Sequence, residues 1–196
     1  MNFHTFIGLV KSDLCRCTDI SLRFFFIAFL CNPAFRLIFF FRLCKYLKAQ
    51  GWVGSYLLYS AVRLIFKLGQ VRFGISLPIE TEVGPGFYIG HYGGIVINGR
   101  AIIGKNCNLS QGVTIGQTNR GSREGVPRIG NGVYVGPGAK IIGGISIGNA
   151  AAIGANAVVT RDIPENGVAV GIPARVISTE GSKGYIDRTD YPPIDL

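Results

Sequence analysis

The chain has few charged residues, two histidines and no long hydrophobic run. Charged side chains make up 16% of its 196 residues, and the histidines are His4 and His91. The apolar, uncharged run at residues 24–35 is interrupted by Pro33 and has 12 residues, whereas a membrane-spanning helix needs about 20. The first residues have no basic segment ahead of their short apolar stretch, so we expect neither a spanning helix nor a cleavable signal.

The five cysteines form no recognisable disulfide or metal pattern. Cys15 and Cys17 are separated by one residue, with no second pair and no histidine at the spacing that zinc sites use. The remaining three are Cys31, Cys44 and Cys107. An odd number of thiols in apolar surroundings is typical of a reducing compartment. We therefore expect reduced cysteines, no metal and a cytoplasmic protein.

Basic residues are concentrated in the first third of the chain. Residues 1–75 hold ten Lys and Arg against two Asp and Glu, or +8, and residues 76–196 hold ten against nine, or +1. Nearly all of the net charge of +9 thus belongs to the N-terminal third, which favours an anionic partner surface. Nucleic acid fits less well, because the basic residues are mixed with runs of phenylalanine rather than with isolated stacking aromatics.

The pattern of residues 1–75 is helical. Asn32 and Pro33 are typical of a helix start, since an N-cap precedes a proline whose missing N–H is not needed there. Gly51 is predicted to end that helix, and Gly69 to end a second helix over residues 52–68.

Aromatic and basic side chains are interleaved along these predicted helices. Such helices can lie in a membrane interface, with the apolar side among acyl chains and Lys and Arg at anionic headgroups. Burial against another subunit is the alternative. We expect contact with the inner face of the cytoplasmic membrane through the following residues: Phe24, Phe25, Phe26, Phe35, Phe39, Phe40, Phe41, Arg36, Arg42, Lys45 and Lys48.

From about residue 77, aliphatic residues recur every six positions. A helix repeats about every 3.6 residues and an alternating strand every two, so neither explains this period. It fits a solenoid with triangular coils, in which each hexad supplies one short strand and one turn and the aliphatic residue points inward. Two of the series are Ile129, Val135, Ile141, Ile147, Ile153, Val159 and Ile97, Ile103, Leu109, Ile115. A third series is offset by two residues from the second, with His91 inside the offset, and consists of Leu77, Val83, Ile89 and Ile95.

Two segments interrupt the repeat. Residues 117–128, QTNRGSREGVPR, lack the aliphatic position and predict a polar loop pushed out of the solenoid. Pro164 and Pro173 end the regular coils, and a polar tail that we expect to be loosely ordered follows. The predicted organisation is a helical region over 1–75, a solenoid over 76–177 and a tail over 178–196.

The repeat and several local motifs together resemble the left-handed β-helix hexapeptide acyltransferases, within the serine acetyltransferase branch and its polysaccharide O-acetyltransferase relatives. The motifs are GHYGGIVI, SQGVTIG, the polar loop and GIPARVI, all within residues 76–177. The resemblance implies a mainly β fold, a left-handed parallel β-helix preceded by a small α-helical region. It also implies an O-acetyltransferase that uses acetyl-CoA and forms a homotrimer with active sites between neighbouring solenoids. Pairing of two trimers stays open.

The catalytic histidine of the family corresponds to His91, which would act as general base on an acceptor hydroxyl. A histidine packed at a register break is the alternative. The coenzyme A groove of the family corresponds to small residues of the later coils and to an arginine able to meet a phosphate. Each glycine in it could instead serve a turn of the solenoid, and the arginine could cap the last coil. These candidates are Thr114, Gly116, Gly136, Gly154, Ala155 and Arg175.

Four positions depart from the serine acetyltransferase pattern. Ser76 and Gly90 stand where that pattern has aspartates near the histidine. Gly125 and Val126 stand where it has a basic residue and a serine-binding histidine. His91 would then be oriented by Ser76, by a backbone carbonyl, or by one of two glutamates, Glu80 and Glu82.

The polar loop keeps three charged residues, Arg120, Arg123 and Glu124. They are candidates for binding the acceptor, or else form a solvated loop. A sugar hydroxyl needs no carboxylate clamp, so we expect the acceptor to be a sugar of a bacterial surface polysaccharide or its lipid-linked precursor.

Other functions stay open. The nearest is a serine acetyltransferase with an altered pocket, and the most distant is a non-catalytic solenoid that serves as a scaffold. A β-helix carbonic anhydrase would need three histidine ligands across a trimer interface, a set that His4 and His91 do not supply in the usual way.

Overall fold

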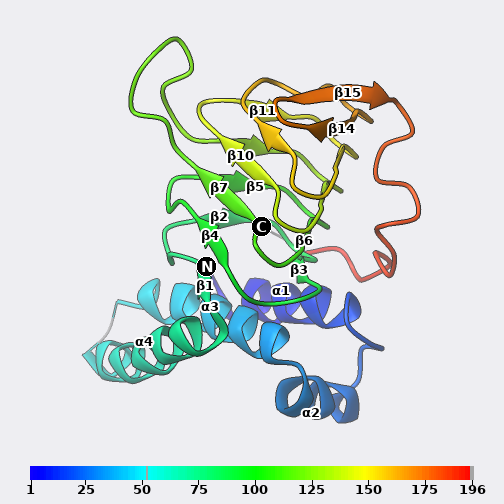
Figure 1. Ribbon diagram of the computed structural model, residues 1–196. Helices are drawn as coiled ribbons and strands as arrows, with labels where there is room; N and C mark the ends of the chain where they lie inside the picture. The colour runs from blue at the N-terminus through cyan, green and yellow to red at the C-terminus, as the bar shows by residue number, and fades with distance from the viewer. Residues whose placement is uncertain (52, 195–196) are drawn as a thin grey trace.

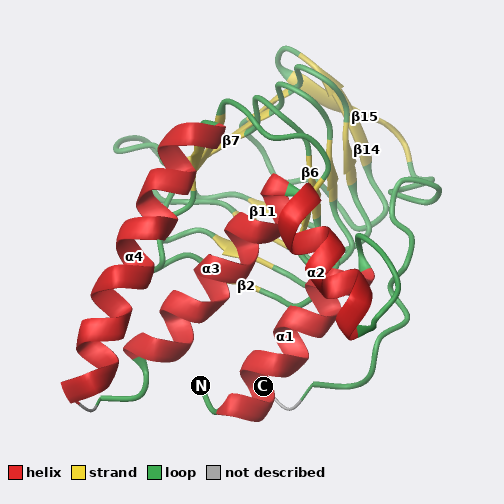
Figure 2. Ribbon diagram, turned by 90° about the horizontal axis from the view of Figure 1, so that it is seen from below, coloured by secondary structure: helices red, strands yellow, loops and turns green. Residues whose placement is uncertain are grey.

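The structure, a computed structural model, describes residues 1–51 and 53–194. Within these residues four helices come first along the chain and fifteen short strands follow, arranged in three sheets (Figure 1). The helices are α1 (Phe3–Cys15), α2 (Leu22–Cys31), α3 (Pro33–Lys48) and α4 (Val53–Phe73). They lie together at one end of the stacked strands, and Figure 2 shows them side by side from that end.

The strands are two to five residues long and are grouped by sheet. Sheet A contains β1 (Ile75–Ser76), β4 (Ile95–Ile97), β7 (Thr114–Gly116), β10 (Lys140–Ile142) and β13 (Val158–Val159). Sheet B contains β2 (Glu82–Val83), β5 (Ile102–Ile103), β8 (Arg128–Ile129) and β11 (Ser146–Ile147). Sheet C contains β3 (Tyr88–Ile89), β6 (Asn108–Leu109), β9 (Tyr134–Val135), β12 (Ala152–Ile153), β14 (Val168–Gly171) and β15 (Ala174–Ser178).

Consecutive strands from β1 to β14 belong to different sheets. From β1 to β13 the chain visits sheets A, B and C in turn, and each strand from β1 to β10 pairs in parallel with the strand one coil later. The last strand, β15, instead turns back antiparallel to β14. The chain therefore winds in coils with one strand in each of three sheets, which fits the predicted β-helix behind a helical region. The left-handed sense of the coils stays a prediction, as does the division into domains.

The aliphatic residues of the six-residue repeat form the core of these coils. Each member of the three series is at most 3% exposed, apart from the half-buried Val83. The prediction that these side chains point inward is confirmed, and the residues beside them in each strand point outward. The core continues without a break from Ile75 and Leu77 into the helices, through Leu37, Phe41 and Phe66.

The start of α3 agrees with the sequence pattern. The Asn32 side chain accepts a hydrogen bond from the Phe35 backbone N–H at 3.0 Å, and Pro33 is the first helical residue. The helix ends at Lys48, and Gly51 follows shortly after with a φ of 72°. A positive φ is accessible to glycine at little cost, which suits the turn toward α4.

The predicted end of α4 at Gly69 is wrong. The helix continues to Phe73, and Gly74, with a φ of 61°, follows it. Gly69 has a packing role instead, because a Cβ at this position would lie 3.2 Å from Leu37 Cδ1 of α3. A glycine inside a helix thus marks the close approach of two helices rather than a helix end.

Several residues that we expected at a membrane surface are inside the protein. Phe35 and Phe41 are at most 1% exposed and Arg42 is 2% exposed. Lys45 donates a hydrogen bond to the Thr81 carbonyl at 2.6 Å. These side chains therefore join the helices to one another and to the first coil. None of the described helices is by itself long and apolar enough to cross a bilayer. Helices α2 and α3 meet that criterion only when they are taken together, and the chain bends by 108° between them.

A buried polar cluster joins α1 and α3 to the first coil. The Asp13 carboxylate accepts hydrogen bonds from Arg42 Nε and from the Phe87 backbone N–H, both at 2.9 Å. Arg42 also donates to the carbonyls of Val83 and Gly84, both at 2.7 Å. Burial raises the pKa of Asp13, although Arg42 and the Phe87 N–H act in the opposite direction. The charge of each partner is thus compensated within the protein.

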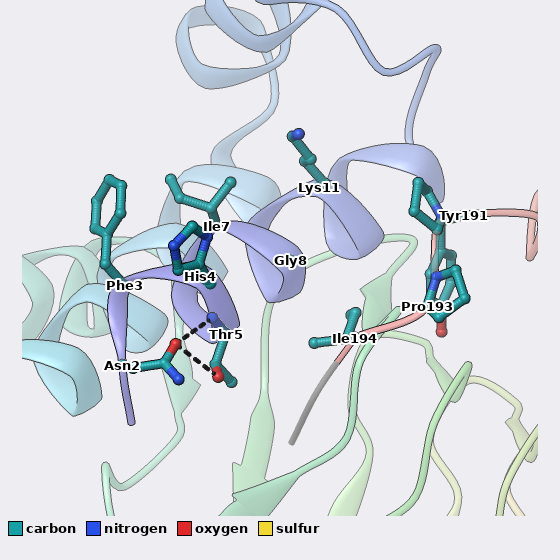
Figure 3. Close-up of a pocket in the computed structure, with 11 residues that line it drawn as sticks. Asn2, Phe3, His4, Thr5, Ile7, Gly8, Lys11, Tyr191, Pro193 and Ile194 are labelled. Atoms are coloured by element: carbon teal, nitrogen blue, oxygen red, sulfur yellow. Dashed lines mark hydrogen bonds between the residues drawn. The ribbon is translucent and has the colours of Figure 1, made fainter.

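The polar tail is packed along the coils rather than loosely ordered. The ring of Tyr185 stacks on Tyr134 with centroids 4.3 Å apart, and Asn108 Nδ2 donates to the Tyr185 carbonyl at 2.8 Å. Further along, Tyr191 donates to Asn106 Oδ1 at 2.8 Å. The described part of the tail reaches α1 at residues 191–194, where it closes one side of a pocket (Figure 3). Aromatic residues spaced along the tail supply these contacts.

The Asp13–Arg42 pair leads to a prediction about stability. Replacing Arg42 by methionine leaves the buried Asp13 carboxylate without its counter-charge and the carbonyls of Val83 and Gly84 without the Arg42 donor, so we expect the free energy of unfolding to fall by about 3–5 kcal/mol. The double variant Asp13→Leu/Arg42→Met leaves no charge in this cluster, and we expect it to be more stable than the single variant. Urea denaturation followed by circular dichroism measures both.

The matched control is an exposed ion pair between the same layers. Lys48 lies 3.8 Å from Glu80 with both side chains more than half exposed, so Lys48→Met is expected to cost at most about 1 kcal/mol. A double variant less stable than Arg42→Met would contradict the interpretation that the buried charge is what makes the single substitution costly.

Candidate functional site

His91 lies in the turn that joins β3 of sheet C to β4 of sheet A. Five residues, 90–94, separate the buried Ile89 from the buried Ile95. In the next coil three residues, 110–112, separate the corresponding Leu109 and Val113. The first coil therefore has two additional residues at this corner, which confirms the shift of register that the sequence placed around His91.

The additional residues bring His91 and Tyr92 to the surface. Gly93 has a φ of 112° and Gly94 a φ of 65°, conformations that suit glycine. Gly94 returns the chain to the stack, since a Cβ there would lie 3.4 Å from Gly112 Cα of the next coil. The side chain of His91 is exposed, so its ring nitrogens are accessible to a ligand.

The position of this turn depends on the helices. The ring of Tyr92 meets the ring of Phe73, the last residue of α4, edge-on at 5.3 Å. The Arg36 guanidinium of α3 lies 5.7 Å from the centre of the same Phe73 ring. Sequence reasoning missed all three residues. An aromatic residue directly after His91 was a signal, but its partner comes from a helix whose packing the sequence does not reveal.

Residues that were expected to orient His91 do not bond to it here. Within residues 1–51 and 53–194 of a single chain no side chain forms a hydrogen bond with the imidazole. Glu80 pairs with Lys48 at 3.8 Å, and Ser76 lies on β1, in register with Val96 of β4. The group that orients the ring stays a prediction.

Three predicted cofactor-binding residues lie at the same corner as His91, in later coils. Gly136 follows β9, and Gly154 and Ala155 follow β12, strands of sheet C that are stacked beyond β3. Gly136 is buried, and a Cβ on it would lie 2.8 Å from the Ile153 carbonyl oxygen. Gly136 thus permits contact between coils, whereas Gly154 is half-buried and Ala155 is exposed.

Arg175 lies on β15 at the far end of sheet C. It is in register with Val170 of β14, and Val170 Cγ1 would be 2.7 Å from a Cβ on Gly154. The side chain of Arg175 is exposed and donates to the Ala174 carbonyl at 3.2 Å. Five strand spacings separate β3 from β15, or about 24 Å. A ligand that contacts both His91 and Arg175 must therefore be long.

The other two candidates, Thr114 and Gly116, lie on β7 in sheet A. Thr114 is half-buried between two buried neighbours, so its side chain points outward. Its partners in register are Val96 and Lys140. At Gly116 a Cβ would lie 2.9 Å from Ile142 Cδ1 of the next coil, so this glycine also serves the contact between coils.

The polar loop 117–128 leaves the coils where sheet A meets sheet B, as the interrupted repeat predicts (Figure 1). Thr118 and Gly125 pair through two backbone hydrogen bonds of 3.1 and 3.0 Å, which closes the loop into a hairpin. Arg123 lies 3.5 Å from Asp162 in an exposed ion pair. Arg120 and Glu124 are exposed as well.

Sheet A separates this loop from His91. The loop is attached at the corner between sheets A and B, whereas His91 lies at the corner between sheets C and A. A single chain therefore does not bring Arg120, Arg123 and Glu124 to the imidazole. Elsewhere, His4 lines the pocket between α1 and the tail (Figure 3), and the described residues contain no group of three His, Cys, Asp or Glu placed to hold a metal ion.

Comparisons with known proteins point to one group of enzymes. The family described as bacterial transferase hexapeptide (six repeats) matches residues 127–161. Serine acetyltransferase from Synechococcus elongatus is 37% identical over 162 residues, which cover 83% of this chain and 63% of that protein. Serine acetyltransferase from Haemophilus influenzae is 37% identical over 123 residues, covering 62% of this chain and 46% of that protein. The chain thus spans less than two thirds of the length of these relatives.

Solved structures are similar over most of the chain. Serine acetyltransferase from Brucella abortus in complex with coenzyme A has a TM-score of 0.72 and 28% identity, and the match covers 88% of this chain and 67% of that one. Another serine acetyltransferase in complex with CoA has a TM-score of 0.70 and 30% identity, with coverage of 88% and 70%.

The expectation of a sugar acceptor is wrong, because the relatives and solved structures named above are serine acetyltransferases. The expectation came from four side chains that are missing from the family pattern. A missing group does not exclude a ligand, because a different side chain can reach the same ligand from another part of the site. The hexapeptide repeats, the parallel three-sheet coils and these similarities agree, and the chain belongs to the hexapeptide-repeat transferases.

Proposed function

We propose that this chain is an O-acetyltransferase that transfers the acetyl group of acetyl-CoA to the hydroxyl of serine. The observation that carries the proposal is the exposed His91, in a turn with two additional residues at one end of a corner lined by small residues. The names of the relatives support serine as acceptor, and the titles of two similar structures support coenzyme A as the carrier of the acetyl group.

In this proposal His91 is the general base. A serine hydroxyl is a weak nucleophile at neutral pH, and an imidazole titrates in the range needed to accept its proton. The hydroxyl oxygen attacks the thioester carbon, the carbon–sulfur bond breaks, and the proton taken by the imidazole passes to the departing sulfur. Backbone N–H groups of the glycine-rich corner are suited to the negative charge that develops on the carbonyl oxygen.

The length of acetyl-CoA, the acetyl donor, fits the length of the corner between sheets C and A that holds His91. The thioester would lie beside His91, the arm of the molecule would follow the surface at Gly154 and Ala155, and the exposed Arg175 would pair with a phosphate. Thr114, on the outer face of sheet A, would border the same path. Gly116 and Gly136 would support it indirectly, by keeping the coils in contact.

The acceptor would be held by the polar loop. Arg120 and Arg123 offer guanidinium groups for the carboxylate of serine, and Glu124 offers a carboxylate for its ammonium group. These charges would take over the role of two residues of the family pattern, a basic residue and a serine-binding histidine. This chain has Gly125 and Val126 at those two positions.

The site requires more than one copy of the chain. His91 and the polar loop lie at different corners of sheet A, so a neighbouring copy would supply the loop that faces His91. A ring of three copies with left-handed coils, related by a three-fold axis, is the assembly that we propose, because a cyclic arrangement completes the same site at every interface.

The reaction and the role of His91 are tested together. With acetyl-CoA and L-serine the purified protein is expected to form O-acetylserine, detected by mass spectrometry. His91→Ala is expected to lower kcat by about 10²–10⁴-fold, because the general base is lost. The matched control is His4→Ala, which leaves the corner intact and is expected to keep the wild-type rate. A folded protein that does not acetylate serine, or a His91→Ala variant as active as wild type, would contradict the proposal.

The shared site is tested by mixing two inactive variants. One is His91→Ala, and the other replaces Arg120, Arg123 and Glu124 by alanine. When equal amounts are refolded together, about a quarter of the interfaces should combine an intact histidine with an intact loop. We expect activity to return to about that fraction of wild type. A mixture no more active than its separate components would show that the histidine and the loop do not share a site across chains.

The contact of Tyr92 with Phe73 is expected to position His91 and so to affect the rate of acetyl transfer. Tyr92→Ala removes the ring that holds the turn against α4, so His91 becomes less well positioned, and we expect kcat to fall by about tenfold with little change in the KM for acetyl-CoA. Tyr92→Phe keeps the ring and is expected to restore the wild-type rate. Equal kcat values for the alanine variant and wild type would show that the ring contact has no positioning role.

A further inference from the structure

The outer face of α4 carries large apolar side chains that no other part of the described structure covers. Six of them, which we call the α4 outer face, are between 49% and 77% exposed. They are Leu57, Leu58, Leu64, Ile65, Leu68 and Val71. The opposite side of the helix, with Val62 and Phe66, is at most 6% exposed and packs in the core. A helix with apolar side chains on both sides has a second partner besides its own fold.

The width of this face is informative. At about 100° per residue, its six side chains cover an arc of about 140°. The contact seam of a coiled coil is narrower, because it uses two positions of each heptad. A broad apolar arc matches a surface that surrounds one side of the helix, as the acyl-chain boundary of a bilayer does.

The charges of α4 are of one sign. Arg63, Lys67 and Arg72 are the charged residues of α4, and all three are exposed. At about 100° per residue, Arg63 and Lys67 lie beyond one edge of the face, and Arg72 lies within its arc at the C-terminal end of the helix. More broadly, residues 20–79 contain eight Lys and Arg and no Asp or Glu. Helix α2, which packs on the other side of α3, has the same character, since Leu22, Phe26, Ile27 and Leu30 are exposed beside Arg23. An anionic surface complements this part of the molecule.

We propose that the α4 outer face binds the surface of an anionic lipid bilayer, with the leucines in the acyl-chain boundary and the basic side chains at the headgroups. The contact is peripheral: α4 lies along the surface. Sequence reasoning assigned such a surface chiefly to the phenylalanines of α2 and α3, several of which are buried, so the structure transfers it to a different helix. Because Phe73 of α4 touches Tyr92 next to His91, the bilayer would lie near the proposed site.

The test is flotation of the full-length protein with vesicles. Wild type is expected to bind vesicles made of equal parts phosphatidylglycerol and phosphatidylcholine, and to bind pure phosphatidylcholine weakly. Leu64→Gln/Leu68→Gln is expected to lower binding by at least about tenfold, because two side chains no longer enter the acyl-chain boundary. Arg63→Gln/Lys67→Gln is expected to lower binding to the anionic vesicles by about tenfold, and high salt to have a similar effect.

The matched control changes two exposed isoleucines at the far end of the coils. Ile172 and Ile177 are 74% and 65% exposed, and Ile172→Gln/Ile177→Gln is expected to bind like wild type. Light scattering after size exclusion reports the oligomeric state of each variant. The proposal is overturned if wild type does not bind anionic vesicles, or if the control lowers binding as much as the leucine variant. It is also overturned if the leucine variant leaves binding unchanged and instead reduces the oligomer, since the face would then be a contact between copies.

Discussion

The stacking distance between coils is the constraint on which the rest of this molecule depends. Adjacent coils are one strand spacing apart, about 4.8 Å, and several corners leave no room for a side chain at that distance. A Cβ on Gly104 would lie 2.5 Å from the Gly130 carbonyl oxygen, and one on Gly84 would lie 2.7 Å from the Gly104 carbonyl carbon. The same distance brings the aliphatic residues of successive coils into contact. The continuous core and the glycine-rich corners thus have a common cause.

A side chain that is to act on a ligand must leave this stack, and the chain leaves it by adding residues. The turn at 90–94 adds two residues and exposes His91, while Tyr92 holds the turn against Phe73. The loop 117–128 leaves at another corner and closes on itself through Thr118 and Gly125. Both departures from the repeat carry residues that we propose for chemistry, in line with the tendency of functional sites to break local structural rules.

The helical layer is attached to the coils by apolar and polar contacts together. The core runs from Ile75 into α3 and α4, and Arg42 joins Asp13 of α1 to the backbone at Val83 and Gly84. Basic residues of this layer therefore divide into two groups. Arg42 satisfies buried groups of the fold, whereas Arg63, Lys67 and Arg72 are exposed beside apolar side chains. Charge counted along the sequence does not distinguish these groups.

The sequence by itself determined the coils, their interruptions and the special position of His91, because these features depend on residues close together in the chain and on one repeated distance. Tertiary structure alone decided which helix faces are exposed and why Gly69 lies inside a helix. It also decided that the tail is ordered and that His91 and the polar loop are on different sides of sheet A. These features depend on contacts between distant segments, such as Asp13 with Arg42 and Tyr191 with Asn106, which no local pattern encodes.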